Sequence, residues 1–170
     1  LKAAGKVKHL GVSNMHAGQM RWLQTALAEP LVVNQLELSL AKLDAIDVGT
    51  TFNDPQAATR PGGIAWAGTL EYAQQHGVQL QAWGSLAQGR FNDPAASAAA
   101  KVVHEIAEAH RTTANAVLLA WLLRHPAGIQ PIIGSGNAER IRACGDATRI
   151  QLSREEWYRL YVTARGQALP

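Results

Sequence analysis

The segment Lys8-His9-Leu10-Gly11-Val12-Ser13-Asn14 decides the fold that this sequence predicts. It passes from a short apolar strand, Leu10 to Val12, into two small polar residues, and the sequence from Met15 onward is typical of a helix. In α/β folds a strand that ends in this way places its polar side chains where such folds bind ligands. The segment therefore predicts a βα unit and a ligand-binding edge.

The same pattern recurs three times along the chain, with helical segments between the repeats. The expected strands are residues 31–33, 78–82 and 129–133, and small, polar or aromatic residues follow each of them. We therefore predict an α/β fold in which four βα units contribute to one parallel sheet.

Apolar periodicity and helix boundary signals predict the helices. They are expected at residues 16–28, 65–76, 96–110, 113–125 and 137–144, with a last helix opened by a capping box from Ser153 to Glu156. Trp22 is expected to pack against a neighbouring element. Residues 1–6 lack an initiator Met and are typical of a last helical turn followed by Gly5, so we expect the sequence to begin inside an element. Residues 38–63 predict a long excursion after the second strand.

Composition restricts the class of protein. A chain of 170 residues, 47% hydrophobic, can bury one core, and we expect residues 1–170 to belong to a single domain. No apolar run is long enough for a membrane span, no secretory leader is visible, and Cys144 has no partner for a disulfide, so a cytoplasmic location is expected. The net charge is +3, and the Lys and Arg residues that carry it are scattered along the sequence. A nucleic-acid binder is therefore the weakest alternative. The six histidines show no ligand spacing, so no metal site is predicted.

The strongest chemical pattern is the segment Gly134-Ser135-Gly136-Asn137, with Arg140 one turn into the following helix. Small residues allow an anion to approach the backbone, and a helix N-terminus attracts negative charge. Arg140 can add a charge-assisted hydrogen bond. The alternative is a glycine-rich helix entry with Ser135 or Asn137 as the N-cap residue.

Polar and aromatic residues that follow the other three strands are candidates for a planar amide ligand. Ser13, Asn14, Asn34 and Gln35 can donate and accept hydrogen bonds to a carboxamide, and Trp83 can stack on a ring. The structural alternatives are helix capping by Asn14, satisfaction of buried backbone groups by Gln35, and a core position for Trp83.

Taken in order, these motifs resemble the carboxyl half of the aldo-keto reductases, most closely the bacterial branch. The resemblance rests on residues 5–14, 34–37, 83–86 and 131–136, together with Glu139-Arg140-Ile141, and it spans nearly the whole chain. It implies a (β/α)₈ TIM barrel, of which this chain would supply the last four βα units, a half barrel, and a C-terminal helix.

The resemblance also implies a cofactor, NADP(H), and assigns residues to it. Ser13, Asn14 and Gln35 would bind the nicotinamide carboxamide, and Trp83 would stack on the nicotinamide ring. Further along the dinucleotide, the implied contacts are Gly84, Ser85 and Leu86 at the pyrophosphate, Ser135 and Arg140 at the 2′-phosphate, and Gly134, Gly136 and Asn137 in the phosphate loop. Gly134 departs from the family pattern, since many members carry lysine there.

The family's catalytic Asp, Tyr, Lys and His come from its first four strands, and no segment of this chain matches them. We therefore assign no catalytic residue. The expected function is NADPH-dependent reduction of an aldehyde or ketone, to which this chain contributes the cofactor-binding half. The alternative is a non-catalytic nucleotide- or phosphate-binding half-barrel module.

Overall fold

The computed structural model describes residues 1–50 and 66–169, and these residues divide into two compact units. One unit comprises residues 1–36 and 44–81, and the other comprises residues 37–43 and 82–170. The four strands form one sheet in the order β1-β2-β3-β4, which is also their order along the chain. The predicted alternation of strands and helices is therefore confirmed.

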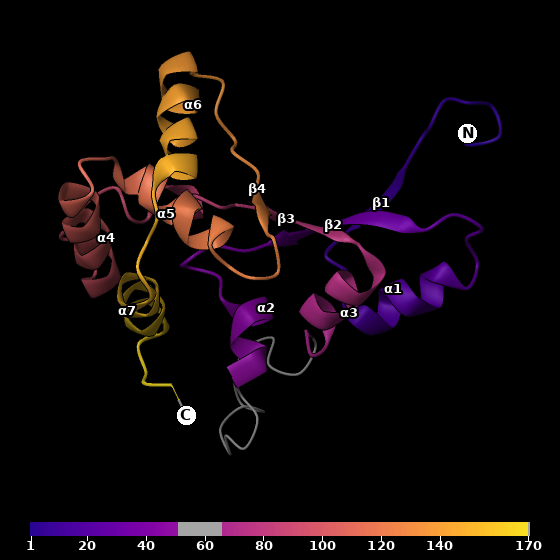
Figure 1. Ribbon diagram of the computed structural model, residues 1–170, viewed down its shortest axis with the longest axis horizontal. Helices are drawn as coiled ribbons and strands as arrows, with labels where there is room; N and C mark the ends of the chain where they lie inside the picture. The colour runs from indigo at the N-terminus through magenta and orange to yellow at the C-terminus, as the bar shows by residue number, and fades with distance from the viewer. Residues whose placement is uncertain (51–65, 170) are drawn as a thin grey trace. The chain divides into compact units, whose positions relative to one another are not determined.

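In the first unit, β1 (Leu10–Ser13) pairs in parallel with β2 (Leu31–Glu37), and Ser13 lies opposite Gln35. The strands approach so closely that a Cβ atom at Gly11 would lie 2.2 Å from Cγ1 of Val33. Only glycine fits that position. The helices α1 (Ala17–Gln24) and α3 (Thr69–His76) lie beside these strands (Figure 1), and the Ala17 amide donates a 3.1 Å hydrogen bond to the buried Thr69 hydroxyl.

The second unit holds most of the buried apolar residues. It contains α4 (Ala98–Ala109), α5 (Ala114–Leu123), α6 (Ala138–Gly145) and α7 (Arg154–Arg165), and α5 is buried along nearly its whole length. The strand β3 (Gln79–Trp83) enters this unit from the first, and β4 (Gln130–Pro131) follows α5. The Ile132 amide donates a 2.8 Å hydrogen bond to the Ala82 carbonyl, which joins β4 to β3.

Local boundary signals read from the sequence are confirmed. Ser153 and Glu156 form the capping box of α7, and Gly77 ends α3 in the left-handed conformation. Thr113, where a helix was expected to begin, is the N-cap residue of α5. At the N-terminus, the Gly5 amide donates to the Lys2 carbonyl and the Lys6 amide to the Leu1 carbonyl. That pair of bonds, with Gly5 left-handed, is the Schellman pattern expected at a helix C-terminus, and residues 2–5 themselves form turns.

Other boundaries differ from the sequence prediction. The helix expected over residues 16–28 ends at Gln24, because that side chain donates to the Leu27 and Glu29 carbonyls and accepts from the Leu31 amide. The strand expected over residues 129–133 has two residues, and Pro131 has no N–H to extend the pairing. The excursion contains an unpredicted α2 (Asp44–Asp47) and a 3₁₀ turn, η1 (Val48–Thr50), while residues 51–63 lie outside the described residues.

Trp22 was expected to pack against a neighbour, and this prediction is wrong for the described structure. Its side chain is 77% exposed, on the outer face of α1. Met20 and Ala17 are the residues that α1 buries. Among the described helices, none is both long and apolar enough to cross a bilayer.

A reciprocal pair of indoles joins α5 to α7. The Trp121 Nε1 donates to the Trp157 carbonyl at 3.2 Å, and the Trp157 Nε1 donates to the Trp121 carbonyl at 2.9 Å. The two rings stack with centroids 5.2 Å apart, and Tyr161 packs against both. Because Trp121 is fully buried, this cluster fixes the C-terminal helix on the second unit.

The indole pair yields a stability prediction with a control of the same residue type. Trp121→Ala removes a fully buried ring and the hydrogen bond that its Nε1 donates to the Trp157 carbonyl, so we expect it to lower the free energy of unfolding by about 3–5 kcal/mol. Trp22→Ala removes an exposed ring and should change it by less than about 0.5 kcal/mol. Urea denaturation followed by circular dichroism measures both, and equal losses would contradict the assigned packing.

A contact between His110, at the end of α4, and Glu156 of α7 depends on pH. Nε2 of His110 lies 2.8 Å from Oε1 of Glu156, and the Ser153 amide donates to Oε2 of Glu156 at 2.7 Å. Burial alone would raise the pKa of Glu156, but these hydrogen bonds and the attraction to His110 outweigh it, so the pKa lies below its ordinary value of 4.5. A lowered native pKa adds stability above pH 4.5 that is lost as the pH falls through the native value.

We therefore expect Glu156→Gln to lower the free energy of unfolding by roughly 1 kcal/mol at pH 7. The difference from the wild type should shrink at pH 3, where the wild-type carboxyl is also neutral. Denaturation curves at the two pH values test this, with the exposed neighbour Glu155→Gln as the control. A difference of the same size at both pH values would show that the charge of Glu156 contributes nothing.

Candidate functional site

In the first unit, three predicted residues lie together where β1 and β2 end. The Ser13 hydroxyl and the Asn14 amide both donate to the Gln35 carbonyl, each at 2.9 Å. Asn14 takes a left-handed conformation with φ of 53°, which asparagine tolerates better than most residues. Ser13, Asn14 and Gln35, the carboxamide cluster, are thus brought side by side by the parallel register.

The structural alternatives for this cluster are settled residue by residue. Asn14 does not cap α1, since the N-cap residue is His16, whose ring accepts from the Gly18 amide. Asn34 is fully buried and its side-chain amide donates to the Met15 carbonyl at 2.7 Å, so it holds the loop after β1. Nε2 of Gln35 donates to Oε1 of Gln81 at 3.0 Å, a side-chain partner that the sequence did not suggest.

In the second unit, Trp83 is half-buried, unlike the core residue Trp121. It is followed by Gly84, whose φ of 65° requires the left-handed region that glycine adopts without strain. Ser85 is buried, and its hydroxyl donates to the Ile132 carbonyl at 2.8 Å. This bond ties the segment after β3 to the segment after β4.

A cavity of about 530 Å³ lies between these two segments. Six predicted residues line it, namely Gly84, Ser85, Leu86, Gly134, Ser135 and Arg140. Its lining contains no aspartate or glutamate, and Arg140 is its cation. We call it the Arg140 cavity. It has the size of a pocket for a small ligand and the charge that suits an anion.

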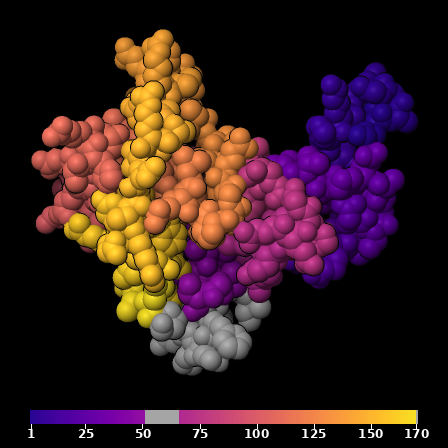
Figure 2. All heavy atoms as spheres, viewed as in Figure 1, coloured from indigo at the N-terminus to yellow at the C-terminus, as the bar shows by residue number. Residues whose placement is uncertain are grey.

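Gly136 and Asn137 belong to the same loop but do not line the cavity. Asn137 is the N-cap residue of α6, since its Oδ1 accepts from the Arg140 amide at 3.0 Å, and the Ser135 hydroxyl accepts from the Asn137 amide at 3.2 Å. The capping alternative is therefore correct for Asn137. The two bonds hold Ser135 and the first turn of α6 at the cavity wall. In Figure 2 the atoms of α6 stand out at the top of this unit, which agrees with the exposure of Arg140.

The sequence did not single out the remaining polar lining of the cavity. Gln88 and Asn92 come from the loop after β3, and Asn115 from the first turn of α5. Ala87 and Gln88 both have left-handed conformations, at φ of 52° and 53°, and such a residue costs about 1–2 kcal/mol. Strained residues of this kind often occur at functional sites, and a side-chain pattern in the sequence does not reveal them.

Cys144 lines the same cavity and is buried. Burial raises the pKa of its thiol above the ordinary value, so the group is a neutral thiol near pH 7. It therefore contributes a wall to the cavity and no reactive thiolate. Within residues 1–50 and 66–169, no group of three or more histidine, cysteine, aspartate or glutamate side chains is arranged to hold a metal ion.

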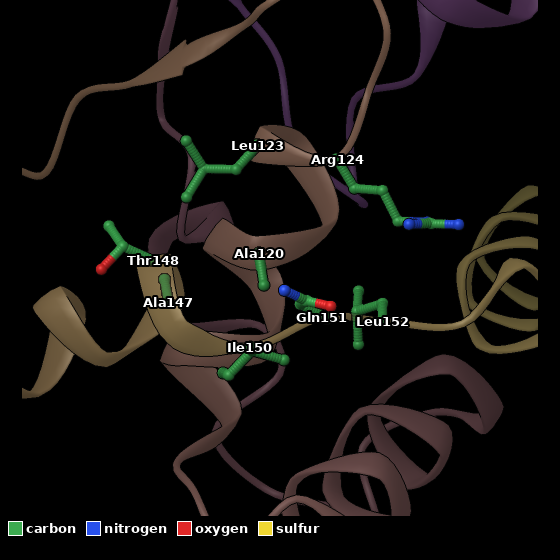
Figure 3. Close-up of a pocket in the computed structure, with 8 residues that line it drawn as sticks. All are labelled: Ala120, Leu123, Arg124, Ala147, Thr148, Ile150, Gln151 and Leu152. Carbon is green, nitrogen blue, oxygen red and sulfur yellow. The ribbon is translucent and has the colours of Figure 1, made fainter.

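A second hollow of the same unit contains none of the predicted site residues. It measures about 380 Å³ and lies between the end of α5 and residues 147–152 (Figure 3). Its walls are mostly apolar, and the Arg124 side chain extends away from Leu123 at its edge (Figure 3). The chemistry of the predicted site is thus concentrated in the Arg140 cavity and in the carboxamide cluster.

Comparisons with known proteins identify the fold and its family. Residues 1–162 match the model of the aldo/keto reductase family. The chain is 37% identical to the 6-dehydroglucose reductase of Agrobacterium fabrum, over 98% of this chain and 50% of that protein. It is 34% identical to the oxidoreductase YdhF of Escherichia coli, over 100% of this chain and 51% of that protein.

Solved structures agree with these matches. A thermostable aldo-keto reductase, Tm1743, superimposes with a TM-score of 0.73 at 27% identity, covering 95% of this chain and 50% of that one. The chain thus spans about half the length of the relatives it matches, and its fold is that of half of an aldo-keto reductase TIM barrel. The expectation from the sequence motifs is confirmed at this level, and the chain belongs to the aldo/keto reductase family.

Proposed function

We propose that residues 1–170 are the C-terminal part of a single aldo-keto reductase domain, one that uses NADPH to reduce an aldehyde or ketone to an alcohol. The observation that carries the proposal is the Arg140 cavity. Six residues chosen from sequence motifs in two segments about 50 residues apart line one pocket, whose cation suits a phosphorylated ligand.

The adenosine end of NADPH fits the chemistry of this cavity. Arg140 would form a charge-assisted hydrogen bond to the 2′-phosphate, and the Ser135 hydroxyl would lie beside it. Gly134, Gly136 and Asn137 shape the loop that leads into α6, where the helix dipole favours an anion. In the loop after β3, Gly84, Ser85 and Leu86 would face the pyrophosphate, with Ser85 held in place by Ile132.

The nicotinamide end would be bound by the remaining predicted residues. Side chains of Ser13, Asn14 and Gln35 offer the donors and acceptors that a carboxamide requires. Trp83, half-buried at the end of β3, would stack on the ring. When bound, NADPH supplies the hydride. We propose that the acid that protonates the carbonyl oxygen lies outside these 170 residues, so none of them is assigned a catalytic role.

The names of three relatives support a carbonyl substrate. The chain resembles 6-dehydroglucose reductases of two bacteria at 37% and 33% identity, and a glyoxal reductase of Bacillus subtilis at 28%. Both names describe reduction of a carbonyl group in a small polar molecule. We propose a small-molecule aldehyde or ketone for this chain as well.

The role of Arg140 gives a prediction with a control on the same helix. Arg140→Ala should weaken NADPH binding by roughly 10- to 100-fold, since a charge-assisted hydrogen bond is lost. It should change NADH binding little, because NADH lacks the 2′-phosphate. Arg142→Ala removes an exposed cation from α6 that does not line the cavity, and both affinities should stay close to those of the wild type. Titrations that follow tryptophan fluorescence measure the dissociation constants of both ligands for the wild type and the two variants.

Equal losses for NADPH and NADH in Arg140→Ala would contradict a 2′-phosphate contact. Equal effects of Arg140→Ala and Arg142→Ala would show that only the general charge of α6 matters.

The isolated chain should bind the cofactor without catalysing carbonyl reduction. We expect it to bind NADPH yet to leave glyoxal unreduced, because the proton donor lies elsewhere. Calorimetry with NADPH and absorbance at the reduced-nicotinamide band test the two properties, with a full-length relative as the positive control. Carbonyl reduction by the 170-residue chain alone would contradict the division of roles. A monodisperse dimer that binds the nucleotide, from a gene with no coding sequence upstream, would favour the non-catalytic module.

A further inference from the structure

Glu37 is a carboxylate in the second unit that the proposed cofactor contacts do not use. It is the last residue of β2, beside the segment that follows β3. The next residue, Leu38, donates its amide to the Trp83 carbonyl at 3.2 Å. A Cβ atom built on Gly84 would lie 3.6 Å from Cγ of Glu37 and 3.9 Å from its Oε1. The carboxylate is therefore next to the Trp83–Gly84 backbone.

The orientation of Glu37 follows from its neighbours along the chain. Leu36 and Leu38 are each 1% exposed, whereas Glu37 is half-buried. Successive side chains of a strand point to opposite faces, so Glu37 points away from the core that buries the two leucines. Trp83 is likewise half-buried, while Ala82 before it is fully buried. Glu37 and Trp83 thus both lie on the partly exposed side of their strands.

The carboxylate has no internal partner in the part of the chain that the structure describes. Neither a hydrogen bond nor an ion pair involves it there. The charge of a half-buried carboxylate is screened less than it would be in water, because protein surrounds part of the group. The carboxylate of Glu37 would therefore stabilise a positive charge placed near it.

We infer that Glu37 sets the preference of this site between the oxidised and the reduced nicotinamide. The inference rests on the proposed function, in which Trp83 stacks on the nicotinamide ring. Oxidation leaves that ring with a positive charge that the reduced ring lacks. A carboxylate beside the stacking residue stabilises the oxidised form selectively, and so it favours release of hydride from the bound cofactor.

The alternative is that Glu37 has a purely structural role, in which its side chain packs against Gly84. The two roles predict different results for the two cofactor forms. A lost charge changes the ratio of the NADP⁺ and NADPH affinities, whereas a displaced Gly84 weakens both forms by the same factor. The ratio of the two dissociation constants is therefore the informative measurement, and it requires no catalysis.

The experiment titrates the 170-residue chain with NADP⁺ and with NADPH by calorimetry. In Glu37→Gln, which keeps the shape of the side chain, the NADP⁺ affinity should fall by roughly three- to tenfold while the NADPH affinity changes by less than about twofold. Glu37→Leu removes the charge independently and should shift the ratio in the same direction. Glu37→Asp, which keeps the charge, should retain most of the wild-type ratio. Glu108→Gln removes one negative charge from the exposed side of α4 and should leave the ratio unchanged.

Circular dichroism identifies any variant that fails to fold, and the others then decide the question. An unchanged ratio in Glu37→Gln and Glu37→Leu, or equal weakening of both cofactor forms, would overturn the inference while leaving the proposed function intact. If the wild-type chain binds neither form, the proposed function itself fails, and the role of Glu37 fails with it.

Discussion

Parallel pairing of short strands is the constraint on which the rest of this structure depends. Because β1 and β2 run in the same direction, with Ser13 opposite Gln35, the residues that follow each strand reach the same edge. The Asn14 amide then bonds to the Gln35 carbonyl, which joins the ends of the two strands. A register shifted by one residue would turn Gln35 to the other face, where Asn34 and Leu36 are buried. In the present register, Val33 lies so close to Gly11 that a Cβ atom at that position would be 2.2 Å from its Cγ1.

In the Arg140 cavity, a few hydrogen bonds hold the ends of two loops around one hollow. The bond from Ser85 to Ile132 sets the distance between the segments after β3 and β4, and Asn137 fixes the start of α6. The Ser85 hydroxyl and the Asn137 side-chain amide thus serve as structural ties. In the loop after β3, Ala87 and Gln88 have left-handed backbone conformations. Contacts with the surrounding residues must stabilise these strained conformations.

Much of the fold was readable from the sequence because its signals are local. Ser153 with Glu156, Thr113 and Gly77 each act within one turn of a helix, so their sequence context suffices. The ordered motifs after the strands also sufficed to recognise the family, which the match over residues 1–162 confirms. Element lengths were less predictable, since Gln24 ends α1 through contacts with residues up to seven positions away.

The composition of the site was predictable only in part, for a related reason. Gly84, Ser85, Leu86, Gly134, Ser135 and Arg140 lie in motifs, and the structure brings them to one cavity. Asn115 reaches the same cavity from the start of α5, and no local pattern distinguishes it from a surface asparagine. Trp22 shows that a local pattern can also mislead. An indole beside an apolar stripe of a helix suggests packing against a neighbour, yet the Trp22 ring is exposed on α1. What each residue contacts in a cofactor stays a prediction.

The central proposal is that the carboxamide cluster and the Arg140 cavity both take part in binding NADP(H). Backbone amide chemical shifts of the isotope-labelled chain, recorded by NMR during titrations with NADP⁺ and with adenosine 2′,5′-bisphosphate, test it most directly. The account predicts that the bisphosphate perturbs residues 134–140 and leaves Ser13, Asn14 and Gln35 unchanged, whereas NADP⁺ perturbs both groups at a single dissociation constant. Perturbation of one group alone by NADP⁺, or perturbations scattered over the surface, would contradict the account.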